Sequence, residues 1–168
     1  INKGVRDYVE AAKIVSLRFP EANFQLSGSL VSHPNSITNI ELEKWIKDKS
    51  IEFLGEIEDV RSILRSCRYF VLPSYNGEGV PRSVLEALST GRPVITTDAP
   101  GCRETVINGK NGLVVPIKDP VSLANAMIRL IEEEDKIIKK MSFESLKIAR
   151  NKFDVNIVNE DMLKIMNL

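Results

Sequence analysis

Apolar residues recur along the chain at two spacings, which predict helices and strands in turn. Over residues 4–19 they lie three or four positions apart, which predicts an amphipathic helix that Pro20 ends. Short apolar runs bounded by turn residues predict strands further on. The predicted strands cover residues 23–26, 51–54, 69–72, 93–96 and 113–115. The predicted helices between them cover residues 40–46, 60–66, 81–89 and 103–107.

The strand sequences indicate the kind of sheet. Residues 69–72 read Tyr-Phe-Val-Leu and residues 93–96 read Pro-Val-Ile-Thr, so neither alternates between apolar and polar. Such runs are typical of parallel strands that helices cover on both faces. The pattern therefore predicts an α/β fold with a doubly wound parallel sheet, followed by extra carboxyl-terminal helices over residues 121–133, 136–152 and 155–166.

Length and composition narrow the class further. A chain of 168 residues fits one domain, and its 43% hydrophobic and 27% charged residues are typical of globular proteins. The 23 cationic side chains balance 23 anionic ones, so no global field favours nucleic acid or an acidic membrane. The charged segment 132–140 is interpreted as a solvated helix boundary. Cys67 and Cys102 have neither a disulfide framework nor metal spacing around them, which fits a reducing compartment.

Ligands of open parallel sheets bind outside the carboxyl ends of the strands. The richest segment there is residues 73–82, which carries glycines at 77 and 79 and enters a helix whose first position is predicted to be Pro81. Free amides at a helix N-terminus suit a phosphate or diphosphate. The loop alone does not separate an anion site from an ordinary glycine-containing turn.

Two phosphate-binding fingerprints fail in this sequence. Lys110 lies between glycines but lacks the spacing and the hydroxyl of a P-loop. Gly77 and Gly79 resemble the start of a dinucleotide fingerprint with Asp98 downstream, but Arg82 occupies the third glycine position. What remains is a carboxylate pair, Glu78 and Glu86, whose acceptor oxygens suit sugar hydroxyls at two points of a long ligand.

Several motifs together resemble one enzyme family. The chain is similar, over nearly its whole length, to the carboxyl-terminal domain of the retaining glycosyltransferases of family 4 (glycosyl transferases group 1), which have the GT-B fold of two facing Rossmann-like domains. The matching segments are residues 72–74, 78–81, 86–87, 91–95, 97–104 and 111–115. The resemblance implies that residues 1–168 are a single donor-binding domain, and that a first strand and an amino-terminal acceptor domain belong upstream.

The resemblance also implies roles for individual residues. In the Glu-x7-Glu motif of the family, the residue matching Glu78 meets donor-sugar hydroxyls and the one matching Glu86 meets the ribose of the nucleotide. Lys3 matches the lysine that neutralises the diphosphate, while Glu78 and Lys3 together are the implied catalytic residues. The resemblance implies further substrate contacts by Gly79, Val80, Pro81 and Arg82 at the loop and helix entry. It implies a contact with the nucleobase by Ile57.

Some positions have a weaker or a different interpretation. Pro100 before Gly101 departs from the Gly-Gly of many members and resembles bacterial surface-polysaccharide members. Glu104 is expected to hold that loop in place. The only histidine, His33, is interpreted as an exposed turn residue.

The resulting expectation is the donor-binding half of a retaining, metal-independent hexosyltransferase that uses a nucleotide-diphosphate sugar, with UDP-sugar as the first choice, and no cofactor. The acceptor would be a sugar, a lipid-linked molecule or a polysaccharide, held by the amino-terminal domain. Nucleic acid is not an expected partner, and the location is the cytoplasm, with peripheral association at the inner face of the membrane left open. Two alternatives remain: a catalytically silent nucleotide-sugar-binding or scaffold module, and a nucleotide-sugar 2-epimerase of the same architecture.

Overall fold

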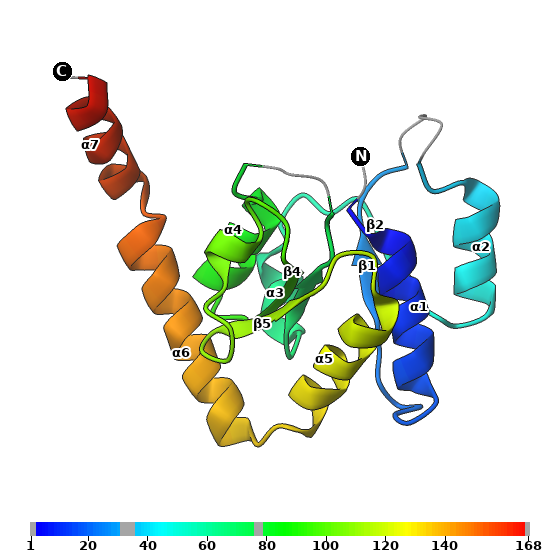
Figure 1. Ribbon diagram of the computed structural model, residues 1–168. Helices are drawn as coiled ribbons and strands as arrows, with labels where there is room; N and C mark the ends of the chain where they lie inside the picture. Colours follow the sequence, from blue (N-terminus) through cyan, green and yellow to red (C-terminus); the bar gives the residue numbers. More distant parts are fainter. Residues whose placement is uncertain (1–2, 31–35, 76–78, 167–168) are drawn as a thin grey trace.

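The computed structural model of the chain describes residues 3–30, 36–75 and 79–166 (Figure 1). The helices are α1 (Val5–Ser16), α2 (Asn39–Lys47), α3 (Arg61–Ser66), α4 (Arg82–Ser89), α5 (Pro120–Glu132), α6 (Asp135–Lys152) and α7 (Val155–Met166), with a 3-10 turn η1 (Arg103–Thr105). The strands are β1 (Gln25–Ser27), β2 (Glu52–Gly55), β3 (Phe70–Leu72), β4 (Val94–Thr97) and β5 (Gly112–Val115). The α/β alternation is confirmed, although the helix predicted over residues 103–107 is only the three-residue 3-10 turn η1.

All strand pairs are parallel, as predicted, but the sheet is in two parts. Within the described residues β1 pairs with β2 alone, and β4 lies between β3 and β5. Side-chain contacts connect the two parts: the thiol of Cys67, which precedes β3, donates to the Gln25 side-chain oxygen of β1 at 3.9 Å, and the Tyr8 hydroxyl of α1 donates to the Gln25 carbonyl at 3.1 Å. Burial, followed by the nearby Tyr69 and Cys67, raises the pKa of the Tyr8 phenol. Tyr8 is therefore packed at the junction of the two sheets.

Helices cover both faces of the strands, which is the doubly wound arrangement (Figure 1). One core lies under α1, α2 and α5 and includes Ile138 and Met141 of α6, and the other lies under α3, α4 and the second half of α6. Strand β4 is buried at every position between them, which explains its unbroken apolar and threonine sequence. The Thr96 hydroxyl donates to the Leu72 carbonyl at 2.8 Å, so its polar group is satisfied inside the sheet.

The carboxyl-terminal helices differ in how much they bury. Helix α6 buries Ile138, Met141 and Ser145, and the Ser145 hydroxyl donates to the Arg92 carbonyl at 2.9 Å. Helix α7 buries no residue and extends away from the sheets beyond α6 (Figure 1). Several large apolar side chains of this last helix are exposed, among them Met162 at 54% and Ile165 at 81%. Among the described helices, none combines the length and the apolar character that crossing a bilayer requires.

Candidate functional site

The carboxyl ends of the parallel strands lie at one edge of the sheets, which we call the ligand edge. Five segments follow the strands there, and the described parts of them are residues 28–30, 56–60, 73–75, 98–102 and 116–119. Helix dipoles and unpaired backbone groups gather at this edge in α/β proteins. The candidate site is therefore built from these segments and from the first turns of α1 and α4.

The start of α1 is pressed against the segment that follows β3. Gly4 has a φ of 70°, and a Cβ atom built on it would lie 1.9 Å from the Pro73 carbonyl oxygen. Only glycine permits both the left-handed backbone and this close approach. Because Lys3 precedes Gly4 directly, the fold holds this half-buried lysine beside the segment that leads to α4.

The entry into α4 is open. Gly79 is exposed and a Cβ atom on it would meet no atom of the described residues within 4 Å, while the Val80 side chain is 41% exposed. Pro81 is buried and precedes the helix with a ψ of 124°, so the prediction that it is the first helical residue is wrong by one position. The reason is its extended backbone, since only its carbonyl joins the first turn by accepting from the Val84 amide. No side chain of the described residues caps this helix, and the amides of Arg82 and Ser83 have no described acceptor, so they are available to a ligand.

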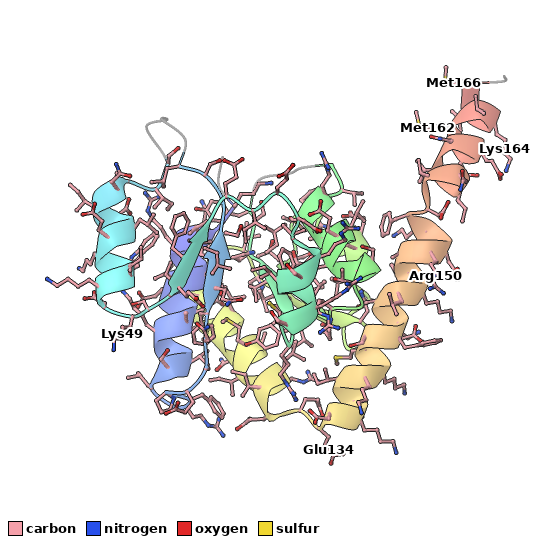
Figure 2. All side chains as sticks on the ribbon, turned by 180° about the vertical axis from the view of Figure 1, so that it is seen from behind. Lys49, Glu134, Arg150, Met162, Lys164 and Met166 are labelled. Atoms are coloured by element: carbon pink, nitrogen blue, oxygen red, sulfur yellow. The ribbon has the colours of Figure 1, made fainter. Side chains whose placement is uncertain are left out.

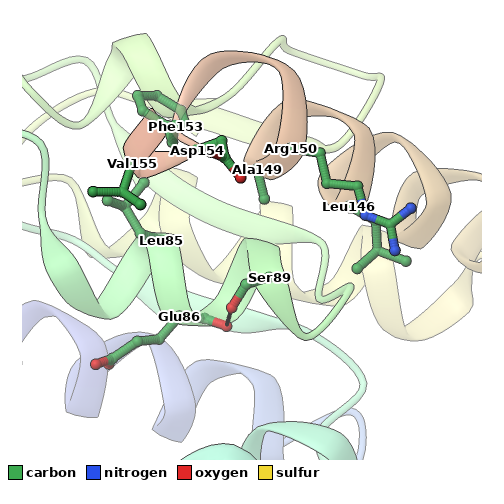
Figure 3. A pocket seen from close by; sticks show the side chains of 9 residues that line it. All are labelled: Leu85, Glu86, Ser89, Leu146, Ala149, Arg150, Phe153, Asp154 and Val155. Atoms are coloured by element: carbon green, nitrogen blue, oxygen red, sulfur yellow. Dashed lines mark hydrogen bonds between the residues drawn. The ribbon is translucent and has the colours of Figure 1, made fainter. Parts of the chain in front are cut away.

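Glu86 lies one turn inside α4 and is half-buried. Its carboxylate points away from Phe153 and Val155, to the opposite side of the helix (Figure 3). Within the described residues it forms neither a hydrogen bond nor an ion pair, whereas its backbone carbonyl accepts from the Ser89 hydroxyl at 2.9 Å. Its predicted partner in recognition, Glu78, falls outside the described residues, as does His33.

The two sheets contribute different parts of the predicted site. Ile57 follows β2 and is half-buried, whereas α4 follows β3 of the other sheet. Lys3 precedes the glycine that packs on the segment between β3 and α4, Gly79 to Arg82 lie at the end of that segment, and Glu86 lies one turn further on. A base contact by Ile57 stays a prediction.

Three residues that the sequence reasoning missed lie at the same edge. Lys118, between β5 and α5, has a φ of 55°, and its ammonium lies 5.2 Å from the centroid of the Tyr75 ring. Burial raises the pKa of the Asp7 carboxyl in the first turn of α1, and the charge of Lys118 opposes that shift. One oxygen of Asp7 is buried without a hydrogen-bond partner among the described residues. The sequence around Lys118 does not indicate this cluster, because Asp119 and Pro120 directly after it are typical of the start of a helix.

An ion pair ties α1 to α2 near the same edge. The Arg6 guanidinium donates to both Glu41 carboxylate oxygens, at 2.7 and 3.0 Å, and to the Ser36 carbonyl at 3.1 Å. Glu41 also closes a capping box with Thr38. The Arg6 hydrogen bond, helped by the Thr38 amide, lowers the pKa of Glu41 to about 2.

The loop after β4 is cross-linked by its own groups. The Asp98 carboxylate accepts from the Arg103 guanidinium at 2.7 Å, and the Glu104 carboxylate accepts from the Gly101 amide at 2.7 Å. Lys152 of α6 donates to the Glu104 carbonyl at 2.6 Å. These contacts confirm the loop-holding role expected for Glu104.

A hollow of about 430 Å³ lies away from this edge, between α4 and the α6–α7 junction (Figure 3). It is lined by Leu85, Glu86, Ser89, Leu146, Ala149, Arg150, Phe153, Asp154 and Val155. Only Glu86 belongs to both places, and its carboxylate points away from the apolar lining. Across residues 3–30, 36–75 and 79–166, no three His, Cys, Asp or Glu side chains gather as a metal would require. Metal independence stays a prediction from the resemblance.

Comparisons with known proteins point to one family. The model of the family described as "Glycosyl transferases group 1" matches residues 1–133. The N,N'-diacetylbacillosaminyl-diphospho-undecaprenol alpha-1,3-N-acetylgalactosaminyltransferase of Campylobacter jejuni is 31% identical over 167 residues, which are 98% of this chain and 41% of that protein. The chain therefore spans less than half of this relative.

Two solved structures have a similar fold. Anabaena Alr3699/HepE, solved in complex with UDP, superposes with a TM-score of 0.83 at 24% identity over 98% of this chain and 45% of that one. The carboxyl-terminal domain of LpcC, a glycosyl transferase group 1 family protein from Francisella tularensis, gives a TM-score of 0.78 at 24% identity over 91% of this chain and 80% of that one.

Proposed function

The chain belongs to the Glycosyl transferases group 1 family, and from this premise we propose that it is the donor-binding half of a retaining glycosyltransferase of family 4. The observation that carries the proposal is the junction of two anion-binding features at the ligand edge. Gly4 packs against Pro73, so Lys3 lies beside the segment that leads into the uncapped start of α4. A cation and free helix amides together suit a diphosphate.

Each site residue has a chemical task in this proposal. Lys3 and the backbone from Gly79 to Arg82, including Val80 and Pro81, bind the diphosphate. Glu86 accepts hydrogen bonds from the ribose, and Ile57 lies against the nucleobase. Glu78 accepts hydrogen bonds from hydroxyls of the donor sugar.

The reaction itself follows from these tasks. Breaking the bond between sugar and diphosphate leaves negative charge on the departing phosphate, which Lys3 and the helix amides stabilise. The sugar is transferred with its anomeric configuration kept. No metal or other cofactor takes part in the proposed step.

We also propose that residues 1–168 form one carboxyl-terminal domain whose first strand lies upstream. The strand pairing supports this. Among the described strands, β1 is hydrogen-bonded only to β2 and β3 only to β4, so β1 and β3 each have one unpaired edge. In the Rossmann strand order, one further strand before α1 would lie between them. The likeness to the solved carboxyl-terminal domain from F. tularensis supports the same assignment.

The proposed donor is a UDP-sugar, since the Anabaena relative was solved with UDP. The proposed acceptor is a sugar on a lipid diphosphate or a polysaccharide, bound by an amino-terminal domain, because the C. jejuni relative is named for a diphospho-undecaprenol acceptor. Nucleic acid is not a proposed partner. Such a reaction takes place in the cytoplasm, at the inner face of the membrane when the acceptor is a lipid.

The test is transfer by the longer protein that contains this chain. Incubation with a panel of nucleotide sugars and lipid-diphosphate acceptors should release a nucleoside diphosphate in step with glycosylated product, and Glu78→Gln should abolish transfer while UDP still binds. Binding without release would identify a silent module instead. Conversion of the nucleotide sugar without an acceptor would identify an epimerase.

A further inference from the structure

The solvent side of α6 carries a row of cations around one exposed aromatic ring. At 3.6 residues per turn, six of its residues fall within a sector of about 100° and extend over about 21 Å of helix. They are Lys136, Lys139, Lys140, Phe143, Lys147 and Arg150, which we call the α6 stripe. All six are exposed, and the Phe143 side chain is 65% exposed.

The opposite side of α6 fixes the direction of this stripe. Ile138, Met141 and Ser145 are buried, and Ser145 donates to the Arg92 carbonyl of the sheet-side core. The helix runs along the outside of the molecule from Glu134 to beyond Arg150, with its outer side chains extending away from the sheets (Figure 2). The stripe therefore faces outward and can meet a flat surface along most of its length, while Arg150 at its end also borders the hollow beside α4.

The charges of the stripe are not neutralised within the described structure. None of its five cations forms an ion pair with a described carboxylate, although Lys139 attracts Asp135 from further away. The Asp135 carboxylate is paired with Arg68 at 2.8 Å, and Glu144 at the margin of the stripe is half-buried. Although the whole chain has 23 cationic and 23 anionic side chains, this face of α6 thus has a local excess of positive charge.

We infer that the α6 stripe is a docking face for an anionic phospholipid surface. A line of cations on one helix face can contact a flat layer of lipid phosphates, and each cation near such a surface adds to the attraction. Phe143 at the centre supplies an aromatic ring that enters the headgroup region, as aromatic side chains do in interfacial helices. This inference does not rest on the proposed sugar transfer, since binding to lipid needs neither donor nor acceptor.

The experiment measures partition of the protein onto vesicles of equimolar phosphatidylcholine and phosphatidylglycerol, with vesicles of phosphatidylcholine alone beside them. We expect binding to the anionic vesicles only, lost near 1 M salt, where the Debye length is about 3 Å. Replacing Lys136, Lys140 and Lys147 by Gln should weaken partition on the order of 100-fold, at roughly fivefold per cation. Phe143→Ala should weaken it roughly fivefold.

A charge-matched control separates the stripe from the overall charge. The triple variant Lys44→Gln, Lys47→Gln and Lys110→Gln removes three exposed cations elsewhere and should leave partition unchanged. Equal loss in both triple variants, or no binding to anionic vesicles, overturns the inference. So does salt-resistant binding that Met162→Ser in α7 abolishes, or tighter binding to duplex DNA than to the vesicles at the same salt.

Discussion

Two segments that follow neighbouring strands of one sheet differ in how their polar groups are satisfied. The loop after β4 is cross-linked by Asp98, Arg103 and Glu104, and α6 holds it from outside through Lys152. Among the described residues, the entry into α4 has no side-chain cap, no atom close to a Cβ built on the exposed Gly79, and no partner for the Glu86 carboxylate. One segment has completed its interactions within the protein, and the other keeps donors and acceptors for a ligand.

The same contrast separates the roles of two glutamates that look alike in the sequence. Glu104 and Glu86 both belong to motifs of the same family resemblance, yet only Glu104 accepts a hydrogen bond from a described backbone amide. A carboxylate that is hydrogen-bonded within the protein stabilises the fold, whereas one at the ligand edge with no described partner has its oxygens free for a ligand. The glycines divide in the same way, with Gly4 fixed by the fold and Gly79 unconstrained by it.

The largest effect on stability should come from Gly4→Ala, with Gly79→Ala as its comparison. Gly4→Ala would place a Cβ atom 1.9 Å from the Pro73 oxygen at a φ of 70°, so we expect the free energy of unfolding to fall by roughly 2–4 kcal/mol. Gly79→Ala should change it by less than about 0.5 kcal/mol, yet weaken UDP binding, because the methyl group occupies space left for the ligand. Urea denaturation and calorimetric titration with UDP measure the two quantities. A stable Gly4→Ala protein would contradict the close packing of α1 on the segment after β3.

The next effect concerns nucleotide affinity at α4. Glu86→Ala should weaken UDP binding by roughly 1–3 kcal/mol, the scale of hydrogen bonds to a charged group, with little change in stability. Glu43→Ala is the matched control, since Glu43 is an exposed helical glutamate on α2. If calorimetry finds the same UDP affinity for wild type and Glu86→Ala, the ribose assignment is wrong.

A substitution in the loop after β4 should have a smaller effect, and it should lower stability instead of UDP affinity. Glu104→Ala removes the acceptor of the Gly101 amide, so the free energy of unfolding should fall by about 1 kcal/mol while UDP affinity stays the same. Chemical denaturation and titration of this variant complete the contrast with Glu86→Ala. A loss of affinity without a loss of stability would reverse the roles given to the two glutamates.

The smallest effect is a pH dependence between α1 and α2. The pKa of Glu41 is about 2 in the folded protein against an ordinary value of 4.5, so its pairing with Arg6 stabilises the fold above pH 4.5 and is lost as the pH falls toward 2. Both side chains are partly exposed, which limits the contribution to under about 1 kcal/mol. Glu41→Gln keeps a capping side chain but not the charge. The difference in unfolding free energy between wild type and this variant should therefore shrink from pH 6 to pH 3.

Local patterns were enough to predict the elements, since helix and strand periods depend on neighbouring residues. They predicted α4 to within one residue, and Pro81 was misplaced because proline is compatible with both the cap and the first turn. The Asp7, Tyr75 and Lys118 cluster could not be predicted, because three distant segments meet only after the strands align. The pairing of the strands was not predicted either, and the gap between β1 and β3 is where the proposed upstream strand would lie.

The division of the sheet also affects how the molecule opens. In the described part of residues 1–168 taken by themselves, no backbone ladder crosses between β1 and β3, so the β1–β2–α2 unit is held by side-chain packing and the α1–α2 ion pair. In the longer protein the proposed upstream strand would lie in this gap, so the easier opening is expected of residues 1–168 by themselves. Units held in this way open at a lower free energy than the global transition. In native-state hydrogen exchange, the amides of β1 and β2 should therefore exchange before those of β4, which is bonded on both sides. A ligand that contacts Ile57 and α4 together would join the two units, and the protection it adds should appear mainly in β1 and β2.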